Sequence, residues 1–425
     1  MADDVLRMGV DLLVVGGGMA GLTAAAFAAR RGTRVMVVEK GPEIGGSALL
    51  SNGYLWTVPS LAAFRSEDPD GDTSLAQVLV GQLPALVEWV RSTGVDVSER
   101  ISVLGYGTGH RIDIGAYLAR CRAIVESAGG WIVPRVEVER LLVVGSSVTG
   151  ARAKDARGDV LEVEATTTLL ATGGFQGDRA SRERYLGSEA GDGLLVRSNP
   201  HSMGDGLRLA LEAGAVGDVS GRGFYGHLVP APLAAFHPKD FLRLALLCSD
   251  RGVLVNERGE RFTEEARGDH HSAQAVLRQP GARAVLVVDD EVRQGSRAPF
   301  IAGMEQLDPL GDAEAVGANV AVADSVDALA ARIHTWGFDR AGVERSLGAA
   351  VGRVLSRAPF TAVEAQPAIT FTYGGIAVDE HASVLGSERR PITGLKAAGA
   401  DIALYRSGYA GGLALAGGFA LRALT

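Results

Sequence analysis

Cysteine is nearly absent from this chain of 425 residues, which has only Cys121 and Cys248. The two lie far apart in the sequence and in no CxxC pair. This excludes a disulfide framework, a redox dithiol and a thiolate metal site, so we expect no metal centre. Reduced cysteines are typical of cytoplasmic proteins, and the cytoplasm is the expected location.

Runs of one charge and low-complexity tails are also lacking. The 42 Lys and Arg residues are scattered among 50 Asp and Glu residues, for a net charge of -8, which argues against a nucleic-acid partner. One uncharged run, 12–29, is as long as a membrane span, but three consecutive glycines interrupt it and Arg30 and Arg31 follow it. We therefore expect a strand, a turn and a buried helix there, and no integral membrane segment.

The order of the segments predicts an α/β protein with more than one domain. Residues 12–15 and 34–39 are apolar runs typical of buried parallel strands, and an alanine-rich helix from about Ala20 joins them. The later segments are helices across about 75–129, an antiparallel meander over 131–164, a buried strand at 168–171, helices at 325–335 and 341–355, a buried strand at 395–398 and a closing helix at 412–424.

The stretch Gly16-Gly17-Gly18-Met19-Ala20-Gly21 fits the GxGxxG dinucleotide fingerprint. It follows a predicted strand, opens a predicted helix, and is followed 18 residues past Gly21 by Glu39. Glycines let the backbone approach a pyrophosphate, the free N–H groups of the helix start bind its oxygens, and a carboxylate binds ribose hydroxyls. The pattern therefore predicts dinucleotide binding.

Two further glycine turns favour FAD over NAD, since both cofactors use this fingerprint. Glu39-Lys40-Gly41 leads on to Ile44–Ser47, and Ala171–Phe175 follows the later buried strand. Both segments resemble parts of flavoproteins that close over FAD. Taken singly, each is equally consistent with a plain tight turn.

Over nearly its whole length the chain resembles the fumarate reductase and succinate dehydrogenase flavoprotein superfamily, which includes the 3-ketosteroid delta-1 dehydrogenases and the tricarballylate dehydrogenases. The matching segments are GGGMAG at Gly16, GGSALLSNG at Gly45, ATGGF at Ala171, MGDGL at Met203, VNERGERF at Val255, TFTYGGIAVD at Thr370, PITGLKAAG at Pro391 and YAGGLAL at Tyr409.

The resemblance implies an FAD site built from both ends of the chain. Its residues would be Gly16, Gly18, Met19, Ala20, Gly21, Glu39, Lys40, Gly45, Gly46, Ser47, Asn52, Gly53, Val136, Ala171, Thr172, Gly173, Asp205, Gly374, Asp401, Gly412, Leu413, Ala414 and Leu415. In such relatives the last of these begin a helix whose N-terminal amides face the isoalloxazine ring and stabilise the anionic reduced flavin. Non-covalent binding is expected, because no histidine lies in 45–53.

The chain departs from this superfamily at residues that matter for binding. Where relatives have Ala-Ala-Gly-Glu, it has Ala397–Ala400 followed by Asp401, which is therefore a candidate for the ribityl contact of that glutamate. Dicarboxylate reductases carry one arginine before the last glycine pair and another after RF-x-x-E, because two carboxylates need guanidinium partners. Those positions hold Tyr409 and, counting from Phe262, Asp269.

Tyr409 is similar to a tyrosine of ketosteroid dehydrogenases whose hydroxyl hydrogen-bonds a substrate carbonyl, although their catalytic tyrosine after RF-x-x-E is missing here. The resemblance thus favours a ketone or enone, with His270 and His271 left to transfer the proton. Further candidates for catalysis are His227, which resembles a substrate-contacting histidine of the fumarate enzymes, and Arg267 and Asp269. The plain alternatives are a packing role for Tyr409 and a solvated loop for the histidine pair.

We therefore expect a Rossmann-type FAD-binding domain formed by 1–223 and 362–425, an inserted α+β capping domain at 224–361, and a small-molecule substrate between them. The expected reaction is hydride transfer between flavin and a substrate next to a carbonyl, with an electron acceptor or donor that stays unidentified. Three alternatives stay open. They are a tricarballylate-like dehydrogenase with Arg267, Arg222 or Arg406 as carboxylate clamp, an oxidase or hydroxylase, and a binding module without redox chemistry.

Overall fold

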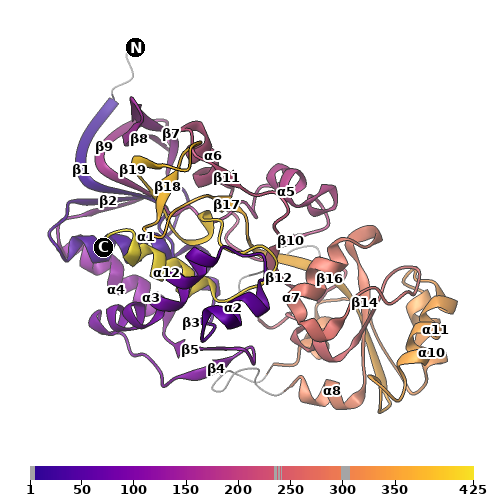
Figure 1. Cartoon of the computed structure of the whole chain (residues 1–425). Helices are drawn as coiled ribbons and strands as arrows, with labels where there is room; N and C mark the ends of the chain where they lie inside the picture. The colour runs from indigo at the N-terminus through magenta and orange to yellow at the C-terminus, as the bar shows by residue number, and fades with distance from the viewer. Residues whose placement is uncertain (1–4, 234–236, 238–239, 241, 298–306) are drawn as a thin grey trace. The chain divides into compact units, whose positions relative to one another are not determined.

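The computed structural model describes residues 5–233, 237, 240, 242–297 and 307–425, and the chain divides into two compact units (Figure 1). Unit 1 comprises Met1–Ser181, Ser198–Gly223 and Phe371–Thr425, and unit 2 comprises Arg182–Arg197 and Phe224–Thr370. Compared with the division drawn from the sequence, unit 2 extends beyond 361 to Thr370 and also takes in Arg182–Arg197, because strand β10 (Leu195–Val196) in that segment pairs with β16 (Phe360–Thr372).

The core of unit 1 is a sheet in which strand β1 (Val5–Val15) lies parallel between β2 (Val35–Glu39) and β9 (Val160–Leu170). Val15 pairs with Val38 on one side and with Leu170 on the other, so these three strands end at the same edge. The carboxyl edge of a parallel sheet is where α/β proteins bind ligands. The segments that follow the strands, at Gly16, Glu39 and Ala171, are thereby brought to one place.

The rest of this sheet comes from the meander and from the end of the chain. It contains β6 (Trp131–Pro134), β7 (Val136–Val144), β8 (Ser147–Asp155), β18 (Ser383–Leu385) and β19 (Pro391–Ala397), in the order β18-β19-β8-β9-β1-β2-β6 with β7 paired to β8. The predicted meander is confirmed for β7, β8 and β9. Its first segment differs, since β6 pairs in parallel with β2, and the buried strand expected at 168–171 is the end of the long β9.

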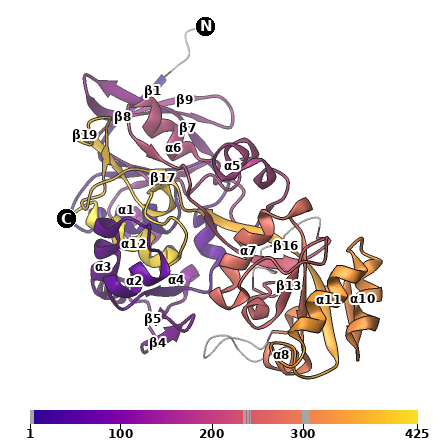
Figure 2. The ribbon, with the colours of Figure 1, turned by 45° about the vertical axis from the view of Figure 1, so that its right-hand side comes forward.

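Helix α1 (Met19–Ala29) is buried on nearly all sides, as its alanine-rich sequence predicts. Helices α4 (Ile114–Ser127) and α12 (Gly412–Arg422) pack against it, and α3 (Thr73–Ser92) packs against α12 (Figure 2). The hydroxyl of Tyr117 in α4 links this helix to α1 and α3, since it hydrogen-bonds Thr23 Oγ1 at 2.8 Å and accepts from Trp89 Nε1 at 2.9 Å. The two ends of the chain therefore share one core.

The prediction of mainly helical structure across 75–129 is wrong in the middle. Strands β4 (Ile101–Val103) and β5 (Gly107–Arg111) form a hairpin that continues onto β3 (Tyr54–Thr57). A side chain at Gly109 would lie 2.2 Å from the carbonyl oxygen of Leu55, so this glycine is required by close strand contact, a signal that its sequence neighbours do not reveal.

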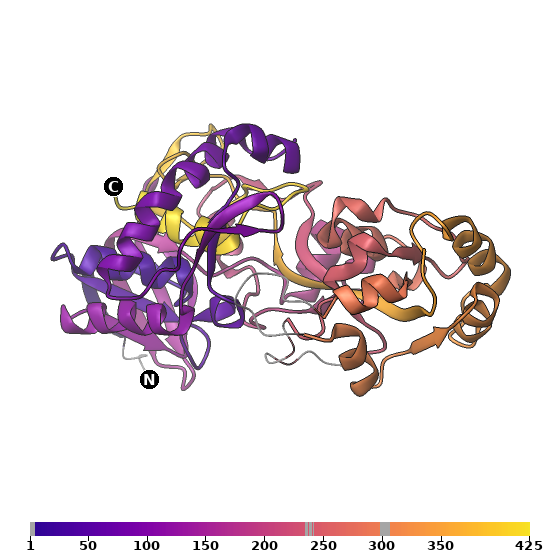
Figure 3. The same cartoon turned by 90° about the horizontal axis from the view of Figure 1, so that it is seen from below.

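Unit 2 is built on a mostly antiparallel sheet around β16. It contains β12 (Phe224–Pro230), β13 (Val253–Val255), β14 (Ala284–Val288) and β15 (Val320–Ala323) besides β10. Alternate side chains pack in opposite directions: Leu254 and Leu286 lie in one apolar cluster with α7 (Asp269–Leu277), and Val255 and Val285 lie in another with α10 (Val326–His334) and α11 (Arg340–Ala350). Helices α10 and α11 lie side by side (Figures 2 and 3).

The remaining described elements are short. They are α2 (Leu61–Glu67), α5 (Arg179–Leu186), α6 (Asp205–Glu212), α8 (Asp290–Gly295), α9 (Pro309–Ala315), β11 (Gly217–Asp218) and β17 (Gly375–Ile376). Among the helices in the described part of the chain, none combines the length and the apolar character needed to cross a bilayer.

Candidate functional site

The three glycines of the fingerprint have different surroundings. Gly16 has a φ of +109° and a Cβ there would lie 2.2 Å from the carbonyl oxygen of Ala171, while a Cβ at Gly21 would lie 1.9 Å from the carbonyl oxygen of Gly16. These two glycines make the turn and its contact with the helix possible. A Cβ at Gly18 would instead meet nothing closer than the carbonyl oxygen of Gly45, 4.0 Å away. The space beside Gly18 fits an approaching pyrophosphate.

Helix α1 begins directly over this turn. Its cap residue, Gly18, offers no side-chain hydrogen bond, and the first turn, with Met19 and Ala20, carries no acidic residue. The helix start therefore presents backbone N–H groups and the positive end of the helix dipole, which suits a phosphate group.

Glu39 lies at the end of β2, beside the turn. Its Oε2 accepts a hydrogen bond from the N–H of Gly17 at 2.7 Å, and its Oε1 accepts one from the N–H of Gly41 at 2.6 Å. The carboxylate is thus fixed where a ribose of a bound dinucleotide would lie. Its neighbour Lys40 forms an ion pair with Asp205 in the first turn of α6.

Asp401 is held against the later glycine turn. Its Oδ1 accepts from Thr172 Oγ1 at 2.9 Å, and its Oδ2 accepts from the N–H of Thr172 and, at 3.2 Å, from the N–H of Gly173. Burial raises the pKa of Asp401 to about 7, although these three donors pull in the opposite direction. In the structure this carboxyl group binds the backbone of the Ala171–Gly173 segment.

The other expected cofactor residues of unit 1 lie around the same edge or at strand starts. The N–H of Gly45 donates to Gly17 at 2.7 Å, which ties the loop that continues through Gly46 to the fingerprint turn, and Ser47 Oγ accepts from the N–H of Asn199 at 3.0 Å. Asn52 and Gly53 precede β3, Val136 begins β7 and is buried, and Gly374 lies between β16 and β17.

Tyr409 lies just before α12, and its hydroxyl is bound to the start of that helix. The N–H of Gly412 donates to the Tyr409 hydroxyl at 2.9 Å. The cap residue of the helix, Gly411, has no side chain that could cap it. Leu413, Ala414 and Leu415 complete the first turn, which has no acidic residue. The bond from Gly412 uses a lone pair of the phenol oxygen and not its proton. A phenol hydroxyl can act both as acceptor and as donor.

Aromatic rings surround Tyr409. The centroid of its ring lies 5.3 Å from that of Trp56 in a T-shaped arrangement, and 5.8 Å from those of both Phe371 and Tyr405. The hydroxyl of Tyr405 donates to the carbonyl oxygen of Gly411 at 3.2 Å, so its proton is used within the loop. Burial raises the pKa of Tyr405 well above its usual value.

The loop before Tyr409 is held by Asp68, a buried carboxylate directly after α2. Its Oδ2 accepts from the N–H of Arg406 at 2.8 Å, and its Oδ1 accepts from the N–H and the hydroxyl of Ser407 at 2.9 and 3.0 Å. The hydroxyl of Tyr106 also donates to the carbonyl oxygen of Tyr409 at 3.1 Å. The position of Tyr409 is thus set by contacts from two other parts of unit 1.

Two arginines near this loop have partners within unit 1. Arg222 is buried and binds Asp218 through Nε at 3.0 Å and the carbonyl oxygen of Tyr405 through Nη1. Arg406 donates to the carbonyl oxygen of Ser220 at 3.2 Å. These guanidinium groups hydrogen-bond groups of unit 1 near the loop that carries Tyr409.

Unit 2 holds the remaining catalytic candidates, and it brings two of them into contact. His227 on β12 and Asp269 at the start of α7 are hydrogen-bonded through Nδ1 and Oδ2. Their side chains are 6% and 12% exposed. Burial, with help from the charge of Arg197, lowers the pKa of His227 despite the nearby carboxylate. Burial acts to raise the pKa of Asp269, but the hydrogen bond and charge of His227 outweigh it and lower it.

The other three candidates of unit 2 are arranged differently. His270 is buried on α7, with its ring 4.2 Å from that of His271, and Arg267 is exposed in a single 3-10 turn, Glu265–Arg267. The alternative of a solvated loop therefore does not hold for His270. Sequence reasoning missed Arg197 and Asp68, whose burial is set by distant residues. The one available signal for Arg197 was its place after the apolar run Leu194–Val196.

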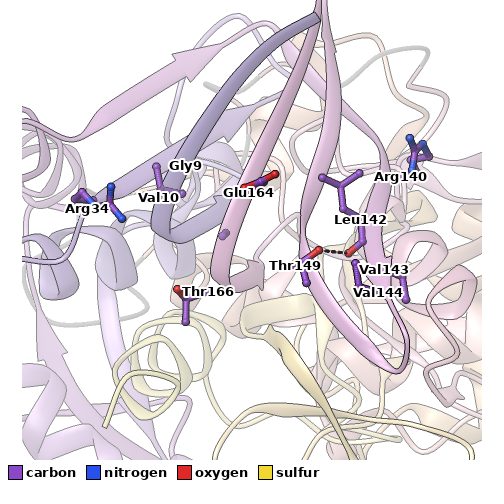
Figure 4. A pocket seen from close by; sticks show the side chains of 11 residues that line it. Gly9, Val10, Arg34, Arg140, Leu142, Val143, Val144, Thr149, Glu164 and Thr166 are labelled. Carbon is purple, nitrogen blue, oxygen red and sulfur yellow. Dashed lines mark hydrogen bonds between the residues drawn. The ribbon is translucent and has the colours of Figure 1, made fainter.

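A surface hollow of about 700 Å³ lies elsewhere in unit 1, on the meander (Figure 4). It is lined by Gly9, Val10, Arg34, Arg140, Leu142, Val143, Val144, Thr149, Glu164, Ala165 and Thr166. None of these is an expected site residue. Gly9 and Val10 are distant along β1 from its carboxyl end, where the glycine turn begins.

Comparison with known proteins agrees with this geometry. The family described as FAD binding domain matches residues 11–419. The fumarate reductase (cytochrome) of Shewanella frigidimarina is 26% identical over 92% of this chain and 71% of its own length. The vinyl phenol reductase of Lactiplantibacillus plantarum is 26% identical over 92% of this chain and 90% of its own.

A solved structure extends the likeness to the whole fold. The 3-ketosteroid delta1-dehydrogenase from Sterolibacterium denitrificans, in complex with 1,4-androstadiene-3,17-dione, superposes with a TM-score of 0.76 at 19% identity. The match covers 98% of this chain and 98% of that one. The mixed α/β fold expected from the sequence is therefore confirmed.

Proposed function

The chain belongs to the FAD-binding domain family, within the superfamily of fumarate reductase and succinate dehydrogenase flavoproteins, and on that premise we propose that its substrate is a ketone or an enone. It is an FAD-dependent oxidoreductase that acts on CH–CH or C=C bonds. In the proposed reaction the bond next to a carbonyl is desaturated, or the reverse takes place.

FAD would be held by residues of unit 1. The turn Gly16–Gly21 and the start of α1 would bind the pyrophosphate, Glu39 the ribose, and the start of α12 the isoalloxazine ring. Bound FAD supplies a hydride acceptor and donor. No histidine lies in 45–53, so we propose non-covalent binding. Acid precipitation should leave the flavin in solution, whereas a yellow precipitate would contradict this.

The observation that carries the proposal is the hydrogen bond from the N–H of Gly412 to the Tyr409 hydroxyl. It fixes the phenol at a helix start, where the positive end of the dipole stabilises electron density on the oxygen. A phenol that accepts one hydrogen bond donates a stronger one, since neighbouring bonds polarise each other. Such a donor suits a carbonyl oxygen that gains negative charge as a proton leaves the adjacent carbon.

The residues around Tyr409 argue against a polycarboxylate substrate. Tyr409 stands where dicarboxylate reductases carry an arginine, and rings of Trp56, Phe371 and Tyr405 lie next to it. Arg222 and Arg406 are engaged with groups of unit 1. Of the three arginines considered as a clamp, Arg267 is exposed, and we keep it as the basis of the second candidate function.

The proposal is tested by anaerobic mixing of the FAD-loaded protein with two sets of compounds while flavin absorbance is followed. One set contains saturated cyclic ketones, and the other contains saturated polycarboxylates such as tricarballylate. For the reverse direction, the photoreduced protein is mixed with enones and unsaturated polycarboxylates. Bleaching or reoxidation by the carbonyl compounds alone supports the proposal, and a response to the polycarboxylates alone favours the tricarballylate-like alternative.

We further propose that the protein acts in the cytoplasm with a separate electron acceptor or donor. Its two cysteines are free and buried, which suits a reducing compartment. Since the flavin must return to its starting state after each turnover, a second redox partner is required.

A further inference from the structure

Unit 2 contains a compact group of buried polar side chains, with His270 Nδ1 4.0 Å from the Asp269 carboxylate beside it. It consists of His227 on β12, Asp269 at the start of α7, and Arg197, which follows β10. Helix α7 packs against β12 (Figure 1). Arg197 is 1% exposed and donates through Nη1 to Thr370 Oγ1 at 2.8 Å. Burying three ionisable groups together is costly unless they interact.

His227 lies on the face of β12 opposite to the side chains that belong to the apolar core cluster. Phe224 and Leu228 belong to the core cluster that includes Ala273 and Val276 of α7. Side chains of a strand alternate between its faces, so His227 lies on the other face, where its ring makes a T-shaped contact with that of Tyr225 at 5.0 Å. Packing alone therefore does not explain a histidine here.

The partner of His227 determines which nitrogen carries the proton. An ionised carboxylate only accepts hydrogen bonds, so Nδ1 bears the hydrogen that is shared with Asp269. Nε2 of the neutral ring is then the nitrogen with the lone pair. A histidine fixed in this tautomer by a carboxylate is arranged to accept a proton.

The charges around the pair favour this state at neutral pH. Burial and the charges of Arg197 and His270 lower the pKa of His227, while Asp269 raises it, and the balance keeps the ring neutral. His227, His270 and Arg197 together lower the pKa of Asp269 against the effect of burial, which keeps it ionised. Asp269 is also in the first turn of α7, where the helix dipole favours a negative charge.

We propose that His227 is the base that takes the proton from the carbon next to the substrate carbonyl, and that Asp269 positions it. The inference rests on the proposed function and assigns its proton-transfer step. In the desaturation, one C–H bond breaks and its proton goes to Nε2 of His227. The electron pair left behind forms the C=C bond as the neighbouring carbon loses a hydride to FAD, which is the oxidant and becomes reduced. In the reverse reaction His227 returns the proton.

This assignment differs from the one suggested by the sequence, which gave proton transfer to the adjacent pair His270 and His271. It also gives a role to Asp269, which stands where dicarboxylate reductases carry an arginine. A carboxylate cannot clamp a second carboxylate, but it can orient an imidazole.

The test compares three variants with the FAD-loaded wild type. They are His227→Gln, Asp269→Asn and, as a control, His334→Gln. His334 lies on α10, where its Nδ1 is 2.9 Å from the carbonyl oxygen of Phe338. The first readout is the rate of flavin reduction by an active ketone as a function of pH. The second is the NMR titration of the His227 ring, which needs no turnover. FAD content and melting temperature show whether each variant is folded.

The inference predicts a loss of flavin reduction on the order of 100-fold or more for His227→Gln and of 10- to 1,000-fold for Asp269→Asn, with little change for His334→Gln. In the wild type the rate rises with pH as His227 loses its proton, and the midpoint matches the NMR titration. In Asp269→Asn both midpoints move to lower pH, because the carboxylate that raises the pKa of His227 is gone.

Other results separate the failures. If a ketone reduces the wild-type flavin but folded His227→Gln keeps its rate, or Asp269→Asn keeps the wild-type pH midpoint, then this pair has only a structural role and the inference is wrong while the proposed function stands. If no ketone or enone reacts with the wild type, the proposed function fails and the inference fails with it.

Discussion

The phenol hydroxyl of Tyr409 accepts a hydrogen bond of 2.9 Å from the backbone N–H of Gly412. The side chain of Tyr409 thereby satisfies an N–H at the start of α12, the helix end that would face the flavin. An arginine, as dicarboxylate reductases have here, has no acceptor atom and could not make this bond. The substitution of tyrosine for arginine therefore changes both the charge and the hydrogen bonding of the site.

Gly18→Val is expected to give a folded protein without FAD. A Cβ at Gly18 would meet no atom of the chain closer than 4.0 Å, so we expect the branched side chain to be tolerated in folding but to fill the space of the pyrophosphate. Gly21→Val is the matched contrast. Its Cβ would lie 1.9 Å from the carbonyl oxygen of Gly16, so this variant should lose folding itself. The measurements are FAD absorbance after gel filtration and far-UV circular dichroism, and normal FAD content in Gly18→Val would remove this turn from the site.

Asp68→Ala is expected to destabilise the protein and to slow turnover. The change leaves the N–H groups of Arg406 and Ser407 without their acceptor, which costs roughly 1–3 kcal/mol and loosens the loop that carries Tyr409. Asp70→Ala is the control, since Asp70 is exposed in the same segment and should change stability by less than about 0.5 kcal/mol. Urea unfolding gives both values, and equal stability of the two variants would show that Asp68 does not anchor the loop.

Asp401 should make stability fall as pH rises. Its pKa is near 4 in the unfolded chain and about 7 in the folded one, so between these values the folded state holds a proton that the unfolded state has lost. Raising the pH across this window therefore favours unfolding, by roughly 1.4 kcal/mol per pH unit at most. This loss of stability is absent below about pH 4 and complete above about pH 7.

Asp401→Asn removes this titration. The difference in unfolding free energy between wild type and Asp401→Asn, measured in urea at pH 5 and at pH 7.5, should therefore change in favour of the variant at the higher pH. A difference that is the same at both values would mean that Asp401 is ionised throughout, with its three hydrogen bonds outweighing burial.

Sequence analysis predicted those parts of the fold and site that depend on residues close together in the sequence. The turn Gly16–Gly21, the strand before it and the helix after it depend on local backbone conformation, and glycine spacing reports that directly. The family match and the curated relatives confirm the superfamily and FAD as cofactor, and the likeness to a solved structure confirms the α/β fold. The hairpin of β4 and β5 was missed because its glycines are required by contact with β3.

The contacts that position the chemistry join residues distant in sequence, and spacing does not predict them. His227 and Asp269 are 42 positions apart and meet because α7 packs on β12. Asp68 lies in an acidic, proline-containing segment that has the composition of a solvated loop, yet it binds residues more than 300 positions away. The sequence therefore identified most of the candidates but did not determine which of them interact.

The central claim is that the Tyr409 hydroxyl stabilises the developing charge on a substrate carbonyl. Its most direct test is the rate of flavin reduction by one active cyclic ketone, in a single anaerobic turnover, for wild type and Tyr409→Phe. Loss of the hydroxyl should cost roughly 2–4 kcal/mol in the transition state, or on the order of 30- to 1,000-fold in rate, with FAD content unchanged. Arg267→Ala should change this rate little. An undiminished rate in Tyr409→Phe would contradict the claim.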